Sequence, residues 1–169
     1  MPSPVPVAKV CATDFLGGAM AEALQLVALL STGLVCGVFF AIAVSVLPTL
    51  FALPPGQYVT VHRLLGKGYH PAMPLIVNAG TLADLALAVL RDGPARGLWA
   101  LAFVAMVAVQ GVSHLCNVPI NRTLVGLDPD AIGPEWTDPR PKWRGYHLIR
   151  TAAAAVALLV TCLATVLPL

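Results

Sequence analysis

Four long apolar stretches constrain this 169-residue chain more than any other feature of its sequence. They run from Leu24 to Leu50, from Pro74 to Leu90, from Leu98 to about Leu115, and from Leu148 to Leu167. A helix needs roughly 20 apolar residues to cross a bilayer, within a range of about 17–25. The second stretch is short for a span, but residues 71–73 can lengthen it. The sequence therefore predicts four transmembrane helices.

The composition supports a membrane protein, because 58% of the residues are hydrophobic and only 11% are charged. We predict an all-α fold, an integral membrane four-helix bundle with helices over about 24–50, 72–90, 98–117 and 147–167. Residues 1–23 contain three prolines and are predicted to form a poorly ordered tail. The net charge of +2 is spread over the loops, so we expect the lipid bilayer, and no nucleic acid, as a partner.

Basic residues divide unequally between the two sides of the predicted bundle. Loop one (51–73) and loop three with its flanks (117–147) together carry six Lys and Arg residues, before Arg150 is added. The N-terminal segment and loop two carry three. Because an excess of Lys and Arg marks the cytoplasmic side, the sequence predicts a multi-pass protein of the cell membrane whose loops one and three are cytoplasmic.

Two polar stripes are predicted at this cytoplasmic end, one on the third helix and one on the fourth. At about 100° per residue, the stripe on the third helix contains Gln110, Ser113, His114 and Asn117, and reaches Asn121 if the helix continues past Pro119. The stripe on the fourth helix contains Trp143, His147, Arg150 and Thr151. An arginine inside a span is costly and normally faces the bundle interior. The two stripes therefore predict a polar pocket between the helices.

Other roles remain open for individual polar residues. His, Trp and Arg at helix ends also serve as interfacial anchors, and Asn and Ser inside spans also hold helices together. Asp84 lies within the second span, where it would either tie two helices together by hydrogen bonding or form part of a proton or ion path.

Three features of the sequence resemble a known family. They are a long first helix ending in proline, "GVFFAIAVSVLPTL"; the element "NVPIN" at Asn117 to Asn121; and the W...H..RT pattern of "WRGYHLIRT" at Trp143 to Thr151. Over about residues 24–167 the chain resembles small four-helix membrane proteins that include the anthrone oxygenases of aromatic polyketide biosynthesis, alongside many bacterial members of unknown function. The resemblance implies a monooxygenase that uses O2 on an apolar, anthrone-like aromatic molecule.

Anthrone oxidation requires a base, donors that hold an oxyanion, and a site open to oxygen. The resemblance implies that His114 or His147 is the base. Developing negative charge would be held by Asn117, Asn121 and Arg150. The side chains expected to contact the substrate are Trp143, which would stack on a flat ring, together with Gln110 and Thr151.

A metal is an alternative use of the same residues, because imidazoles suit copper and iron. No HxxxH or HxH spacing is present, so the ligands would come from separate segments. The preferred set is His62, His114 and His147, with His70 as a substitute. The other alternative is oxygen chemistry without a cofactor.

The sequence is also compatible with a membrane protein that is not an enzyme. Four short helices with an inward polar pocket would suit a small-molecule transporter or a structural membrane subunit. The small size and the absence of an inverted repeat disfavour a transporter, although a homo-oligomer would weaken that objection.

Overall fold

The computed structural model describes residues 7–167, with side chains from residue 17 onward, and this part of the chain is helical without a strand. The helices in chain order are α1 (Val7–Ala41), α2 (Leu47–Ala52), α3 (Pro55–Tyr69), α4 (Ala72–Leu90), α5 (Gly93–Val112), α6 (Val118–Val125) and α7 (Arg140–Val166). Two π-helical segments, η1 (Ile42–Val46) and η2 (Ser113–Asn117), join α1 to α2 and α5 to α6, and a short 3-10 turn, η3 (Pro129–Ala131), precedes α7.

Four continuous helical stretches have the length and composition to cross a membrane. They cover residues 17–52, 72–90, 93–125 and 140–166. The predicted all-α integral membrane bundle is therefore confirmed. The second stretch begins and ends where the sequence predicted, at Ala72 and Leu90.

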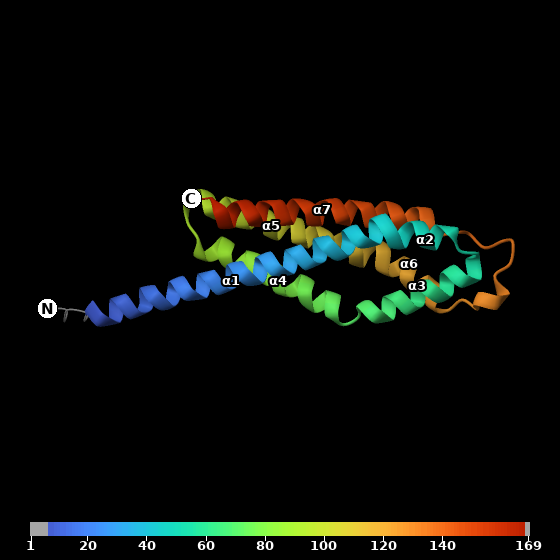
Figure 1. Cartoon of the computed structure of the whole chain (residues 1–169), viewed down its shortest axis with the longest axis horizontal. Coiled ribbons are helices and arrows are strands. Elements are labelled where there is room, and N and C mark those ends of the chain that lie inside the picture. The colour runs from blue at the N-terminus through green and yellow to red at the C-terminus, as the bar shows by residue number, and fades with distance from the viewer. Residues whose placement is uncertain (1–6, 168–169) are drawn as a thin grey trace.

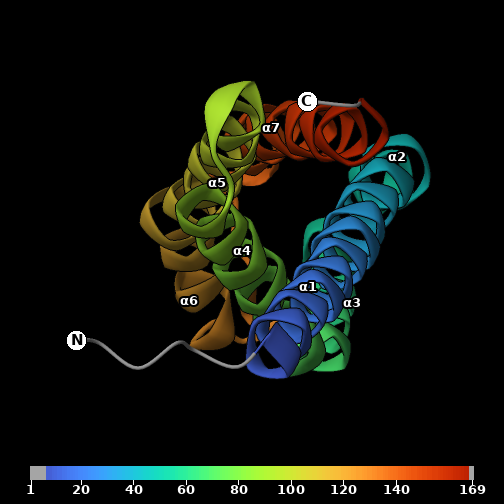
Figure 2. The same cartoon turned by 90° about the vertical axis from the view of Figure 1, so that its left-hand side faces the viewer.

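The spans pack as a closed ring in which α1 contacts α4, α4 contacts α5, α5 contacts α7, and α7 contacts α1. Figure 1 shows the four helices side by side along the long axis, and Figure 2 shows them from one end, arranged around that axis. Fully buried alanines such as Ala28, Ala102 and Ala154 line the contacts. At Gly80, a Cβ atom would come within 2.9 Å of the Ser31 side chain, so glycine permits the close approach of α1 to α4.

The boundaries of the first, third and last spans differ from those predicted, and the third span covers residues 93–125 in place of about 98–117. α1 begins at Val7, so residues 7–23 are helix where a tail was predicted, and only residues 1–6 of that tail lie outside the described part. No proline follows Pro6 in this segment, which is rich in alanine, a strong helix former. α7 begins at Arg140, earlier than residue 147, and the Asp138 carboxylate just before it accepts a hydrogen bond from the Arg140 backbone amide.

Loop one is not an irregular connection, because it contains the amphipathic helix α3. Its buried residues Tyr58, Val59 and His62 face the end of the bundle. Arg63 donates to the carbonyl of Leu124, which fastens α3 to α6. α3 therefore covers the end of the bundle where the polar stripes were predicted.

Arg140 fastens α7 to the end of the first span. Its Nη1 atom donates to the Leu50 and Leu53 carbonyls at 3.0 and 2.8 Å, and its guanidinium forms an ion pair with Asp138 at 2.8 Å. The Leu50 carbonyl belongs to the last turn of α2, where backbone acceptors have no partner within the helix. Arg140 thus supplies the missing donors and fixes the position of α2 against α7.

Asp84 is fully buried, and neither carboxylate oxygen has a hydrogen-bond partner among the described residues. The expected hydrogen bond that would tie two helices together is therefore not formed. Thr81, one turn earlier on α4, instead accepts a hydrogen bond from Gln110 at 2.7 Å and joins α4 to α5.

Replacement of Asp84 by leucine should stabilise the bundle. An unpaired buried polar group costs roughly 1–3 kcal/mol, and leucine removes that penalty, although its side chain is larger than that of aspartate. We expect Asp84→Leu to raise the thermal midpoint in detergent by a few degrees, as about 1 kcal/mol would produce in a chain of this size. Asp84→Asn is the matched control and should change the midpoint little. A lower midpoint for Asp84→Leu would mean that Asp84 has a stabilising partner.

Candidate active site

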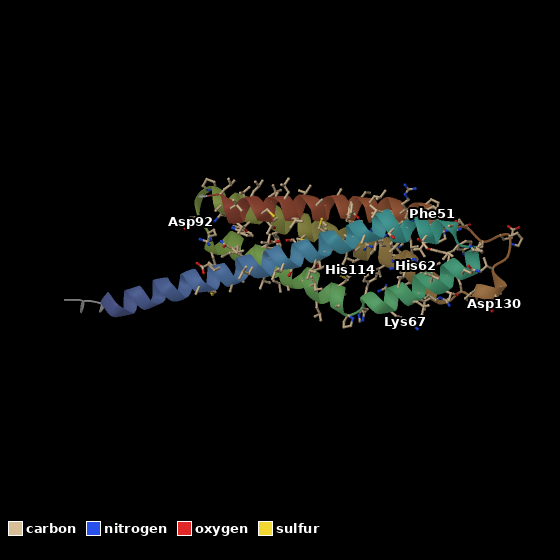
Figure 3. The ribbon with its side chains drawn as sticks, in the orientation of Figure 1. Phe51, His62, Lys67, Asp92, His114 and Asp130 are labelled. Carbon is tan, nitrogen blue, oxygen red and sulfur yellow. The ribbon has the colours of Figure 1, made fainter. Side chains whose placement is uncertain are left out.

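A cavity of about 320 Å³ lies where α3 meets the ends of the four spans. Its walls are mostly apolar, with contributions from Val38, Ile42, Val46, Leu65, Met73, Val77 and Val109. Its polar lining consists of His62, Tyr69, His70, Asn78, Gln110, Ser113, His114, Asn121, Trp143 and Arg150. Figure 3 shows His62 and His114 in this half of the molecule, away from Asp92 at the other end. The volume lies near the lower limit of small-molecule pockets, about 300 Å³.

Both π-helical segments contribute to the cavity and share one local cause. η1 ends two residues before Pro48, and η2 ends two residues before Pro119. Proline cannot donate to the carbonyl four residues earlier, and its ring collides with that carbonyl, so the preceding turn widens. The helix continues past Pro119, and Asn121 therefore does reach the predicted stripe.

Arg150 lies in the cavity wall and is held on several sides. Its Nε and Nη2 atoms lie 3.1 and 3.0 Å from Nδ1 of His147, and Nη1 donates to the Ser113 hydroxyl at 3.2 Å. The centre of the guanidinium lies 4.4 Å from the centroid of the Phe39 ring and 5.5 Å from that of Trp143. These contacts fix the guanidinium plane at the cavity wall.

No carboxylate neutralises Arg150 within the described residues. The two ion pairs in this part of the chain are Arg96–Asp92 and Arg140–Asp138. A guanidinium carries five N–H donors, and the three contacts to His147 and Ser113 leave two without a described partner. The site therefore has an unpaired positive charge and spare donors at the edge of an apolar cavity.

His147 is fully buried and has both ring nitrogens occupied. Nε2 lies 3.0 Å from the Phe39 carbonyl, which only accepts hydrogen bonds, so Nε2 carries the proton. Nδ1 is then the acceptor for Arg150. His147 also stacks on Trp143, with ring centroids 5.1 Å apart and planes inclined by 6°. Its position suits an orienting group for Arg150, whereas a proton acceptor would need a free lone pair.

Asn121 joins α6 to both α3 and α7. Its Oδ1 atom accepts from the indole Nε1 of Trp143 at 2.8 Å and lies 2.9 Å from Nε2 of His62. Asn117 is buried and donates to the Trp143 backbone carbonyl at 3.1 Å. The NVPIN element thus positions Trp143 from two sides.

Burial lowers the pKa of His62 below its usual value, and the hydrogen bond with Asn121 offsets part of that effect. The His62 side chain is 8% exposed and contacts the edges of two aromatic rings, Tyr58 and Trp143. The His62 imidazole is therefore uncharged at neutral pH.

The structure brings together most of the residues expected to form the site. Those that line the cavity are Gln110, His114, Asn121, Trp143 and Arg150. Asn117 and His147 stand behind this wall and contact it. Thr151 bonds to the His147 carbonyl of its own helix and does not line the cavity. His114 is exposed and has no hydrogen bond to a described side chain. Phe39 and Asn78 were missed; Phe39 lies in the quoted first-helix motif, but nothing in the sequence places its carbonyl at His147.

A metal centre, the alternative use of these residues, is not assembled in the described part of the chain. Among the described residues, no three His, Cys, Asp or Glu side chains converge as metal ligands would. In the set of His62, His114 and His147, the last has no free nitrogen and lies against the positive charge of Arg150. His70, the substitute ligand, does not complete the set. These residues do not fit a copper or iron ion.

The fold is that of a small helical membrane protein, and its cavity has a cationic side chain, Arg150, in the wall. The family model described as anthrone oxygenase matches residues 62–160, which is more than half of the chain. The chain therefore belongs to the anthrone oxygenase family. No curated protein and no solved structure matches it. The matched segment contains His62, His147 and Arg150, and Phe39 lies before it.

The lowered pKa of His62 predicts loss of stability in acid. The unfolded chain binds a proton below about pH 6.5, whereas the folded state resists protonation at this site. The contribution of His62 to the free energy of unfolding is constant above that pH and is lost as the pH falls below it. The thermal midpoint of the wild type should drop between about pH 6.5 and pH 5. His62→Gln should show a smaller drop, and an equal drop in both proteins would contradict the assignment.

Proposed function

We propose that this protein is a membrane-embedded oxygenase that oxidises an apolar aromatic molecule of the anthrone type with O2. Such molecules arise in aromatic polyketide biosynthesis. The observation that carries the proposal is Arg150, a cation without a carboxylate partner among the described residues, at the wall of an apolar cavity. Membership of the anthrone oxygenase family supports the same reaction class.

The chemistry of an anthrone explains why such a charge is useful. The molecule is a neutral ketone and enters an apolar cavity readily. Loss of a proton from its methylene carbon gives an anion whose charge is delocalised onto the ketone oxygen. O2 then reacts at the methylene carbon, which becomes a carbonyl, while the second oxygen atom leaves as water. The charge exists only after proton loss, so Arg150 stabilises the reacting anion more than the bound substrate.

The surrounding residues divide the remaining tasks. Arg150 donates to the developing oxyanion, and the Asn121 amide nitrogen, which has no described partner, is a second donor at the wall. Trp143 offers an aromatic surface to a flat substrate, although His147 covers one of its faces. Gln110 contacts the substrate from α5. Asn117, His147 and Thr151 act through these neighbours and do not contact the substrate themselves.

The substrate reaches the cavity from the side. The lining residues Pro74, Asn78 and His114 are exposed, and they come from the start of α4 and from η2. In a membrane, this part of the surface faces the acyl chains or the headgroup region. Lateral access suits an apolar substrate that partitions into the bilayer, and dissolved O2 takes the same route.

Arg150→Lys should impair oxidation without unfolding the protein. Lysine keeps the charge but lacks the planar set of donors that His147 and Ser113 orient. Loss of one charge-assisted hydrogen bond, about 1.5–3 kcal/mol, predicts a decrease in kcat of about 10- to 100-fold. The rate is measured as O2 consumption and quinone formation from anthrone in lipid nanodiscs.

Arg144→Lys, at an exposed position of the same helix, is the matched control and should keep wild-type turnover. Unchanged turnover in Arg150→Lys would remove Arg150 from the reaction. A wild type that takes up anthrone without oxidising it would contradict the proposed enzyme and favour a transporter.

We also propose that the cavity end faces the cytoplasm, on the excess of basic residues in loops one and three. The test is Asp130→Cys in a background in which the native cysteines are replaced, since Asp130 is exposed in the connection before α7. Intact cells should not be labelled at this position by an impermeant thiol reagent, and lysed cells should be. Ready labelling of intact cells would reverse the orientation.

A further inference from the structure

We propose that His62 is the base that removes the proton from the substrate, a role that the sequence assigned to His114 or His147. The inference rests on the oxygenase function proposed above and names the residue that begins the reaction. It follows from a chain of hydrogen bonds that fixes the position of the imidazole proton.

This series of hydrogen bonds begins at Trp143. Its indole nitrogen can only donate, so the Asn121 atom that it contacts at 2.8 Å must be the amide oxygen. The same oxygen lies 2.9 Å from Nε2 of His62. Because an amide oxygen only accepts, Nε2 of His62 must carry the proton. In the neutral ring the lone pair is then on Nδ1, and Nδ1 has no hydrogen-bond partner among the described residues.

The surroundings of His62 suit proton removal. The side chain lines the cavity but is only 8% exposed, so bulk water has little access to it. Burial keeps the ring neutral, and the Asn121 oxygen stabilises the imidazolium that forms, because Nε2–H becomes a stronger donor.

The other three histidines are less suited to this role. His70 lines the cavity, but it is exposed and lacks a described hydrogen-bond partner that would fix its tautomer. The lone pair of His147 is occupied by Arg150, and its ring is fully buried behind Trp143. His114 lines the cavity, but it is exposed and lacks a described partner that would fix its ring or its tautomer. His62 alone of the four combines a fixed tautomer, a lone pair without a described partner and a place at the wall.

His62 and Arg150 are also placed to act on one substrate. The His62 ring centroid lies 5.3 Å from the Trp143 ring centroid, and the guanidinium centre of Arg150 lies 5.5 Å from a Trp143 ring centroid. In the proposed step, the methylene C–H bond breaks and the proton passes to Nδ1 of His62. The electron pair moves through the central ring to the ketone oxygen, which Arg150 binds. No oxidant is consumed in this step.

The test separates proton removal from oxidation. Anthrone is incubated with the protein in D2O without oxygen, and deuterium incorporation at the methylene carbon is measured by mass spectrometry after subtraction of the uncatalysed exchange. His62→Gln keeps an amide donor for Asn121 but has no basic lone pair. We expect it to lose about 10²- to 10⁴-fold in exchange and in aerobic oxidation, with KM little changed.

Thr60→Ala on the same helix is the control and should keep both rates, because Thr60 is exposed and bonds only to the Gly56 carbonyl. If His62→Gln fails to purify as a folded protein, His62→Ala with added imidazole replaces it. Restoration of exchange by imidazole would support a base at this position, and a folded His62→Ala without such rescue would contradict it.

The outcomes distinguish this inference from the function on which it rests. If the wild type oxidises anthrone and His62→Gln keeps wild-type exchange, the inference is wrong and the oxygenase function stands. If His114→Gln loses deuterium exchange and His62→Gln keeps it, the base is His114. A wild type that neither exchanges nor oxidises anthrone would contradict the proposed function itself.

Discussion

The positive charge of Arg150 inside the bundle is the constraint on which the rest of the site depends. A guanidinium without a counterion is costly in a membrane interior. The protein offsets this cost with the His147 lone pair, the Ser113 hydroxyl and the faces of Phe39 and Trp143, and it uses no carboxylate among the described residues. A carboxylate would have neutralised the charge and removed the attraction for an anion. The arrangement therefore keeps the charge in place and available to a ligand.

The first and third spans contain π-helical segments next to the cavity that holds Arg150. Pro48 and Pro119 widen the preceding turns, and the resulting π-helical segments line the cavity from two sides. Beyond Pro119 the helix continues, which brings Asn121 to Trp143 and His62. α3 then closes the end of the bundle and adds a neutral imidazole to a wall that already holds a cation. The proposed acid–base role of His62 and the proposed electrostatic role of Arg150 thus come from separate segments of the chain.

Much of this could be predicted from the sequence. Hydropathy placed the four spans, and helical periodicity placed Trp143, His147 and Arg150 on one face, because both depend on local spacing. Contacts between distant segments could not be predicted in this way. The Phe39 carbonyl occupies a nitrogen of His147, which does not fit the alternative metal set, and no local pattern indicates that contact. The helical nature of loop one was missed because α3 is amphipathic and too short to resemble a span.

The most direct test of the central claim is the absorption spectrum of anthrone bound to the wild-type protein near neutral pH without oxygen. The conjugate anion of anthrone is more extensively conjugated than the ketone and absorbs at longer wavelength. If Arg150 binds the oxyanion, the bound molecule should show the spectrum of the anion, and admission of O2 should convert it to quinone. A preparation that oxidises anthrone in air but shows only the neutral ketone when anaerobic, with the same spectrum in Arg150→Lys, would contradict the claim.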